Sequence, residues 1–131
     1  MIKVIIGIRR KKGMSPEAFH KHWRTTHAEL VRTNPASRKY IRKYVQCHTL
    51  AAEYVRGEVA YDGTAELWFD SVEDKDRFFN DPEYLKKIRP DEGRFADMTT
   101  TVFFVTEEEP VIEVEARKAI LPSESRSGSL K

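Results

Sequence analysis

The spacing of apolar residues along this chain changes from the two-residue repeat of a strand to the three-to-four-residue repeat of a helix and back, and this order restricts the possible folds. Residues 2–9 are apolar and rich in β-branched side chains, which predicts a buried strand. Ser15 and Pro16 have the residue types of an N-cap and a first helical position. One face of the helix that follows carries Phe19, Trp23, His27 and Leu30. We therefore expect a helix over 16–32 that ends before Pro35.

The rest of the chain continues this alternation. In order, the pattern predicts a strand over 38–50, an excursion over 51–61, a strand over 64–70, a helix over 72–80, a short helix over 82–88, a loop over 89–96 and a strand over 98–106. The resulting order, βαββαβ, is that of the ferredoxin-like α+β fold. We expect a four-stranded antiparallel sheet with helices on one face only. Trp68 and Phe103 are expected on the bare face, and a second copy related by a two-fold axis would cover it.

Length and composition limit the chain to one such domain. Its 131 residues predict a domain over 1–109, followed by an arm and a small polar tail over 110–131. The net charge of +2 does not indicate a nucleic-acid partner, and no apolar run approaches the length of a membrane span. The N-terminal apolar stretch is too short for a signal peptide. The single cysteine, Cys47, excludes an internal disulfide and a cysteine-built zinc site, so we expect a cytoplasmic protein.

Two groups of side chains are candidates for chemistry. His27 lies on the apolar helix face, either as a satisfied core residue or as a general acid or base. Tyr44, Gln46 and His48 alternate along the second strand and must share one of its faces. If Val45 and Cys47 pack beneath a helix, the three polar groups point away from it, either to solvent or into a polar cavity. A phenol there can polarise a carbonyl group, and an imidazole can carry a proton.

A third group lies on the next strand. Glu66 and Trp68 share a face, and a partly buried carboxylate there needs a partner, either an arginine, His27 or His48. Asp91 and Glu92 are expected to cap a neighbouring helix, or alternatively to contact a ligand. The histidines at 20, 22 and 27 lack the i, i+4 spacing of a metal site, and no glycine-rich phosphate loop or nucleotide fingerprint occurs. The sequence therefore predicts no metal and no cofactor.

Several segments resemble the EthD-domain family. They are "RRKKGMSPEAFHKHWRTTHAELV" from residue 9, "KYVQCH" at 43–48, "DGTAELWFDS" at 62–71, "DEGRFAD" at 91–97 and "VTEE" at 105–108. The resemblance covers about residues 2–108 and implies a homodimeric α+β barrel. It also implies cofactor-independent chemistry like that of fungal polyketide tailoring enzymes. His27 and Tyr44 match the acid/base pair of such relatives, and Glu66 with Trp68 matches the third-strand motif.

These observations lead to one main hypothesis and several alternatives. We expect a cofactor-free lyase acting on an aromatic polyketide acid, most simply a decarboxylase. His27 and Tyr44 would act on the substrate, His48 and Glu66 would orient it or His27, and Arg42 would hold its carboxylate. Gln46 and Trp68 would line the substrate site. Dehydration, cyclisation or isomerisation would use the same groups. A non-catalytic small-molecule-binding or protein-binding module, or an oxygenase with or without haem, are the alternatives from other classes.

Overall fold

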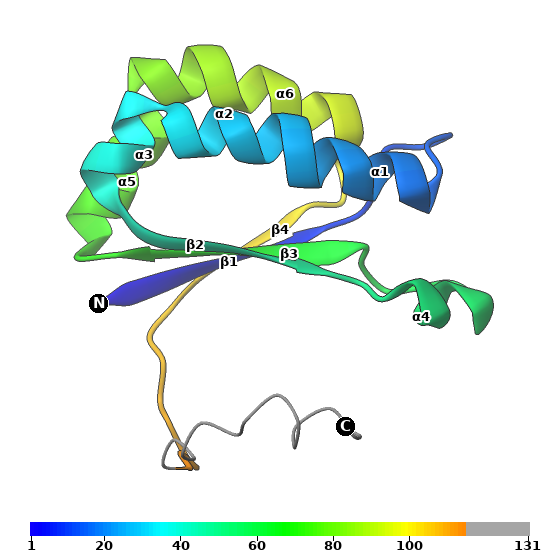
Figure 1. The fold of residues 1–131 in the computed structure, drawn as a ribbon. Helices are drawn as coiled ribbons and strands as arrows, with labels where there is room; N and C mark the ends of the chain where they lie inside the picture. The colour runs from blue at the N-terminus through cyan, green and yellow to red at the C-terminus, as the bar shows by residue number, and fades with distance from the viewer. Residues whose placement is uncertain (115–131) are drawn as a thin grey trace, which may run out of the picture.

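A single antiparallel sheet forms one layer of the protein, and helices form the other (Figure 1). The computed structural model describes residues 1–114. The strands are β1 (Ile2–Ile8), β2 (Ile41–His48), β3 (Gly63–Phe69) and β4 (Val102–Thr106), in the spatial order β2-β3-β1-β4. All neighbouring strands are antiparallel. The predicted ferredoxin-like α+β fold is confirmed.

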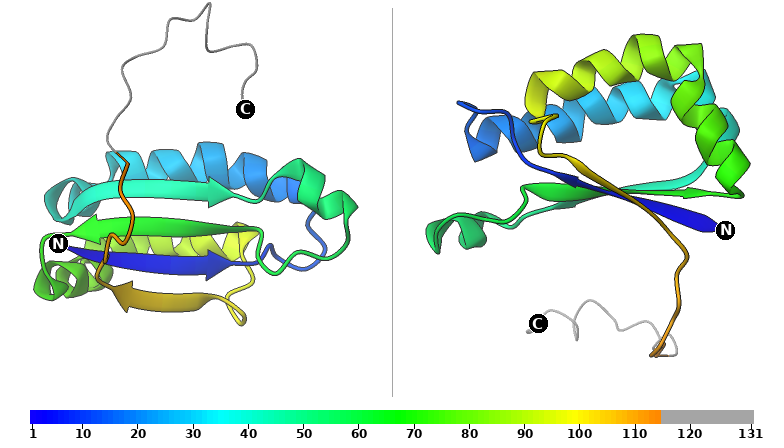
Figure 2. Two further views of the ribbon diagram at one scale, coloured as in Figure 1. Left: turned by 90° about the horizontal axis from the view of Figure 1, so that it is seen from below. Right: turned by 180° about the vertical axis from the view of Figure 1, so that it is seen from behind.

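The helices lie on one face of the sheet, except for a short one beyond the end of β2 (Figures 1 and 2). They are α1 (Pro16–His22), η1 (Trp23–His27), α2 (Ala28–Thr33), α3 (Pro35–Tyr40), α4 (Ala51–Val55), α5 (Val72–Asn80), η2 (Tyr84–Ile88) and α6 (Arg89–Phe95). The two elements η1 and η2 are single π-helical turns. The outlying helix is α4, within the predicted excursion. None of the helices in the described part of the chain is long and apolar enough to cross a membrane.

The first helical run begins where the sequence predicts and continues without a break through α1, η1 and α2. The Ser15 hydroxyl accepts a hydrogen bond from the backbone N–H of Ala18 at 3.1 Å, which caps the run. The buried positions then follow every four residues: Phe19, Trp23, His27 and Val31. An α-helix has 3.6 residues per turn, so such a series rotates away from the core unless a wider turn corrects it. The π turn η1 supplies that correction, and Val31 is the buried residue in place of the predicted Leu30.

The second helical run differs more from expectation. Ser71 caps α5 over the predicted residues, accepting a hydrogen bond from the Asp74 N–H at 3.1 Å. Residues 89–95, however, form α6 and are not a loop. Pro90 lies in the first turn of α6, directly after the π turn η2, where its missing N–H interrupts the helix least. As a result α6 runs beside α2 above the sheet (Figure 2).

The register of the sheet decides which side chains face the helices. Ala65, Leu67 and Phe69 of β3 are buried beneath them, whereas Glu66 and Trp68 point to the bare face. Gln46 pairs with Ala65, so Tyr44, Gln46 and His48 face the helices, and the expectation that Val45 and Cys47 pack there is wrong.

The fourth strand needs a similar correction. Phe103 pairs with Ile6 on the helix side, and Phe104, not Phe103, lies on the bare face. Phe104 pairs with Ile5 there, and 53% of its surface is exposed.

After β4 the chain passes beneath the bare face of the sheet (Figure 2). Glu108 accepts a hydrogen bond from the Trp68 indole at 3.0 Å and lies 3.5 Å from the Lys3 ammonium. This holds the start of the segment against the sheet. The predicted boundary at 109 stays a prediction, and most of the predicted tail over 110–131 lies outside the described residues.

Gly63 is required where β3 passes the first helical run. A Cβ atom at Gly63 would collide with the Cys47 carbonyl oxygen and lie 2.5 Å from the Trp23 ring. We expect Gly63→Ala to lower the free energy of unfolding by about 1–3 kcal/mol, as overpacking does. Gly93, in α6, has open space around its Cβ position. Gly93→Ala is the control and should raise stability by about 0.5–1 kcal/mol. Urea denaturation of both variants measures the difference, and equal stabilities would contradict the packing argument.

Candidate active site

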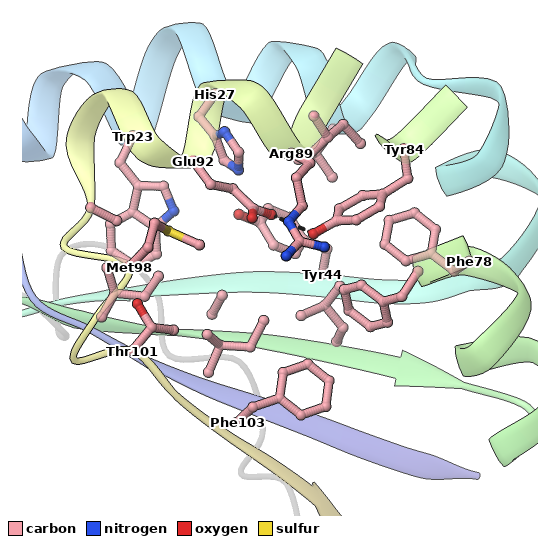
Figure 3. Close-up of a pocket in the computed structure, with 18 of the residues that line it drawn as sticks. Trp23, His27, Tyr44, Phe78, Tyr84, Arg89, Glu92, Met98, Thr101 and Phe103 are labelled. Carbon is pink, nitrogen blue, oxygen red and sulfur yellow. Dashed lines mark hydrogen bonds between the residues drawn. The ribbon is translucent and has the colours of Figure 1, made fainter. Parts of the chain in front are cut away.

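A cavity of about 350 Å³ lies between the helices and the sheet (Figure 3). Its walls are mainly apolar, formed by side chains such as Val31, Leu67, Phe78, Ile88 and Phe103. A few polar groups come from four elements and point into the same space: His27, Tyr44, Tyr84, Arg89 and Glu92. A mostly apolar cavity with a few convergent polar groups is the usual form of a small-molecule site.

His27 is held by a buried carboxylate. Its Nδ1 atom lies 2.8 Å from Oδ2 of Asp91, whose side chain is fully buried. Asp91 also accepts from His22 Nε2 at 2.9 Å and from the Arg94 guanidinium at 3.3 Å. Burial alone would raise the pKa of Asp91, but the hydrogen bonds from His27 and His22 keep it below its ordinary value. The ionised carboxylate therefore accepts a hydrogen bond from the Nδ1–H of His27, which leaves Nε2 as the ring nitrogen without a proton.

Burial also sets the charge of His27. Removal from water lowers the pKa of His27, and the hydrogen bond to Asp91 opposes this only in part. The imidazole is therefore neutral near pH 7, with a lone pair on Nε2. This is the state in which a histidine takes up a proton from a ligand.

Glu92 shows the complementary shift. Burial raises the pKa of this carboxyl, although the Tyr84 hydroxyl donates to Oε2 at 2.8 Å and the nearby Arg89 favours the charged form. A carboxyl with a raised pKa is able to give a proton at neutral pH. The cavity thus contains a neutral imidazole and a carboxyl whose pKa is raised by burial, the combination typical of acid/base sites.

Tyr44 lies on the sheet side of the same cavity (Figure 3). Burial raises the pKa of its phenol, so Tyr44 stays protonated. Its oxygen accepts a hydrogen bond from Gln46 Nε2 at 3.2 Å, and the same nitrogen donates to the Trp23 carbonyl oxygen at 2.8 Å. The phenol proton of Tyr44 is left available for a ligand.

The structure brings some of the predicted site residues together. His27 and Tyr44 line the cavity, and Gln46 contacts it through Tyr44. His48 lies one residue pair farther along β2, where its Nε2 is 2.8 Å from Gln46 Oε1. These four residues remain candidates.

Three others lie elsewhere. Glu66 and Trp68 are on the bare face, because the β3 register turns them away from the helices. The expectation that an arginine, His27 or His48 is the partner of Glu66 is wrong, since Lys3 pairs with it at 2.8 Å. Arg42 lines a separate groove on the outer side of β2, where it pairs with Asp70 at 2.7 Å.

The sequence reasoning missed part of the cavity. Asp91 and Glu92 are predicted to cap a helix or, as the alternative, to contact a ligand; Glu92 lines the cavity and Asp91 holds His27. The predicted site residues do not include Tyr84 and Arg89. The available signal was a pair of acidic residues directly after Pro90, which is typical of a first helical turn. Within residues 1–114 no group of three or more histidine, cysteine or acidic side chains is arranged so that it could hold a metal ion.

Comparison with known proteins identifies the family. Residues 11–99 match the model of the EthD domain. The chain belongs to the EthD-domain family. It is 33% identical over 99 residues to a protein named decarboxylase from Claviceps purpurea, covering 67% of this chain and 69% of that one. It is 30% identical over 107 residues to the conidial pigment biosynthesis dehydratase EthD of Metarhizium robertsii, covering 73% and 74%.

Solved structures support the fold. An EthD family protein of Bacillus halodurans superposes with a TM-score of 0.62 at 21% identity, over 83% of this chain and 100% of that one. A dimeric protein with a ferredoxin-like fold from Bacteroides fragilis superposes with a TM-score of 0.61 at 16% identity, over 82% and 95%. These two sequence relatives are thus named a decarboxylase and a dehydratase, and the structural relatives share the architecture.

The buried histidine makes the stability of this EthD-domain protein depend on pH. The folded-state pKa of His27 lies below its unfolded value of about 6.5, so the unfolded chain binds more protons as pH falls through this range. We expect the free energy of unfolding to fall below about pH 6.5, and His27→Gln to reduce this fall. His20 and His48 shift in the same direction, so part of the fall remains. Urea denaturation at several pH values measures the free energy of unfolding. If this free energy falls with pH as steeply in His27→Gln as in the native protein, the lowered pKa of His27 is contradicted.

Proposed function

We propose that this chain is a cofactor-independent lyase that decarboxylates an aromatic polyketide acid in the cavity between helices and sheet. The observation that carries the proposal is the pairing of a neutral histidine, His27, with a carboxyl of raised pKa, Glu92, in one mostly apolar space. Relatives named decarboxylase and dehydratase support the reaction class. The apolar lining suits a flat aromatic substrate.

The groups of the cavity account for each proton in this reaction. For a substrate with a phenol next to its carboxylate, His27 Nε2 takes the phenol proton. Glu92 gives its proton to the ring carbon that bears the carboxylate, which makes a β-keto acid. The bond between that carbon and the carboxylate then breaks, CO₂ leaves, and the electron pair restores the aromatic ring as a phenolate. His27 returns its proton to the phenolate, and Glu92 regains one from water.

The other polar groups stabilise charge during these steps. Tyr44 donates a hydrogen bond to the substrate oxygen on which negative charge develops. Its O–H is free for this bond because Gln46 donates to the Tyr44 oxygen and does not accept from it. Arg89 lines the cavity beside Glu92 and attracts the anionic substrate (Figure 3). Asp91 fixes the ring nitrogen that His27 presents. It acts through His27 and does not touch the substrate.

Dehydration is the second candidate reaction, and one relative is named a dehydratase. In that case Glu92 would protonate a leaving hydroxyl group and His27 would remove a proton from the neighbouring carbon. The same cavity and the same residues serve both reactions. The mass of the product separates them.

We also propose that two copies associate through the bare face of the sheet. That face carries Ile5, Val45, Trp68 and Phe104. A two-fold axis would bury both copies of this surface at once. The Bacteroides fragilis protein, described as dimeric, has the same fold.

The first experiment incubates the protein with a panel of 2-hydroxyaryl carboxylic acids and follows the products by mass. We expect a product lighter by one CO₂. His27→Gln, Glu92→Gln and Tyr44→Phe should each lower kcat, by about 10²–10⁴-fold for the acid and the base. Glu29→Gln is the matched control, because Glu29 is exposed on the outer side of α2. Full activity in His27→Gln and Glu92→Gln would refute the proton assignments, and loss of water would select dehydration.

Light scattering tests the association. We expect twice the mass of one chain for the native protein and a shift toward the monomer for Phe104→Asp. Phe104 is half exposed in the single chain, so this substitution does not disturb the core. Val72→Asp, at an exposed apolar position on α5, should leave the mass unchanged. A monomeric native protein would end this proposal.

A further inference from the structure

A continuous set of hydrogen bonds leads from Tyr44 away from the cavity to the far end of the first helical run. From Tyr44 it passes through Gln46, His48, His20 and Tyr54 to Asp62. The Nδ1 atoms of His48 and His20 are 2.6 Å apart. His20 Nε2 is 3.0 Å from the Tyr54 hydroxyl, which is 2.5 Å from Asp62 Oδ1. None of the residues beyond Gln46 belongs to the cavity lining.

At the cavity end of this hydrogen-bond series, the donor and the acceptor of each bond are fixed. Gln46 Nε2 donates to the Trp23 carbonyl oxygen and to the Tyr44 hydroxyl, so both of its amide protons are used. Oε1 is therefore the atom that faces His48 Nε2 at 2.8 Å. An amide oxygen only accepts, so His48 must carry a proton on Nε2.

The far end is fixed as well. Asp62 Oδ2 accepts from the Arg10 backbone N–H at 2.7 Å, and Oδ1 accepts from its guanidinium at 2.9 Å. These bonds keep the pKa of Asp62 low, so the carboxylate is ionised and only accepts. Tyr54 must give Asp62 its single proton. The Tyr54 oxygen is then an acceptor for His20, which must carry a proton on Nε2.

These directions determine how many protons the two histidines hold. Each imidazole has one proton on Nε2, and a hydrogen bond between the two Nδ1 atoms requires one more. We propose that His20 and His48 form a proton-binding site in which one proton is shared between their Nδ1 atoms, so that the pair carries a single positive charge. If the pair is neutral, the hydrogen-bond series has one proton too few. At one of its contacts, two acceptor atoms then face each other with no proton between them.

The surroundings favour His20 as the ring with the positive charge. Burial, together with Arg24 and Arg10, holds the pKa of His20 below the ordinary value, and Asp62 and Glu17 partly oppose this shift. Burial, Arg24 and His20 itself lower the pKa of His48 to about 4. His48 therefore stays neutral and accepts at Nδ1. The pair takes up its proton below about pH 6.5, the ordinary histidine value.

When this proton is lost, the hydrogen bond from Tyr54 to Asp62 is the first of the series to break. Asp62 keeps both bonds from Arg10 when the Tyr54 hydroxyl turns toward His20. The Gln46 side chain cannot adjust in the same way. Rotation of its amide would break its hydrogen bonds to Trp23 and Tyr44. His48 thus presents the same Nε2 proton to Gln46 in both states. On the function proposed above, His20 and His48 are positioning residues for Tyr44, as Asp91 is for His27.

Imidazole nitrogen NMR on the full chain tests the site without any substrate. From about pH 8 to about pH 5, we expect His48 to remain a neutral ring protonated on Nε2 and His20 to take up one proton. Tyr54→Phe removes the acceptor of the His20 Nε2 proton. It should lower the proton affinity of His20 about tenfold, or one pH unit. Tyr61→Phe is the matched control, because its hydroxyl contacts neither histidine, and should titrate like the native protein.

Three results would overturn the proposal: a proton on His48 Nδ1 in place of Nε2, independent uptake of one proton by each ring over the same pH range, or an unchanged titration in Tyr54→Phe. If that variant does not fold, His20→Gln gives a second measurement. Without the His20 charge, the pKa of His48 should rise from about 4, and a value that stays there refutes the pair. Because the readout is not turnover, a protein with this titration but no lyase activity would refute only the proposed function.

Discussion

The fully buried carboxylate of Asp91 is the interaction on which the arrangement of this protein depends. An ionised carboxylate in an apolar interior is costly unless donors surround it. Asp91 receives donors from His22, His27 and Arg94, the first two from the opposite helical run. These bonds require α6 to lie beside α1 and η1 in one register. That register also turns the next residue, Glu92, into the cavity, so the positions of His27 and Glu92, the proposed base and acid, both follow from one carboxylate.

Two π-helical turns give the helices the shape that this arrangement needs. The turn η1 ends at His27 and η2 begins at Tyr84, so each contributes a side chain to the cavity. A π turn rotates the residues that follow it relative to an ideal α-helix, and such turns are frequent at functional sites. Here η1 keeps residues spaced by four on the buried face, and η2 joins directly to the proline of α6.

The candidate active site and the pair of His20 and His48 are organised by the same kind of interaction. In each, an ionised aspartate fixes the proton of a neighbouring group, and that group fixes the next one. Asp91 sets the His27 ring directly, whereas Asp62 acts through Tyr54 and His20. Hydrogen bonds in a poorly solvated environment are stronger and more directional than in water. Both sides of the cavity are therefore organised before a ligand arrives.

The sequence by itself determined the βαββαβ order of the strands and the two main helical runs, the cap at Ser15, and the candidates His27 and Tyr44. Each of these depends on residues close together in the chain, which is the range over which periodicity and capping act. Only the tertiary structure decided which sheet face meets the helices, because a two-residue repeat is identical when read from either face. Separation along the chain hid the partners of His27 and Glu66. Asp91 lies 64 positions from His27, and no local pattern joins two such residues until the helices pack.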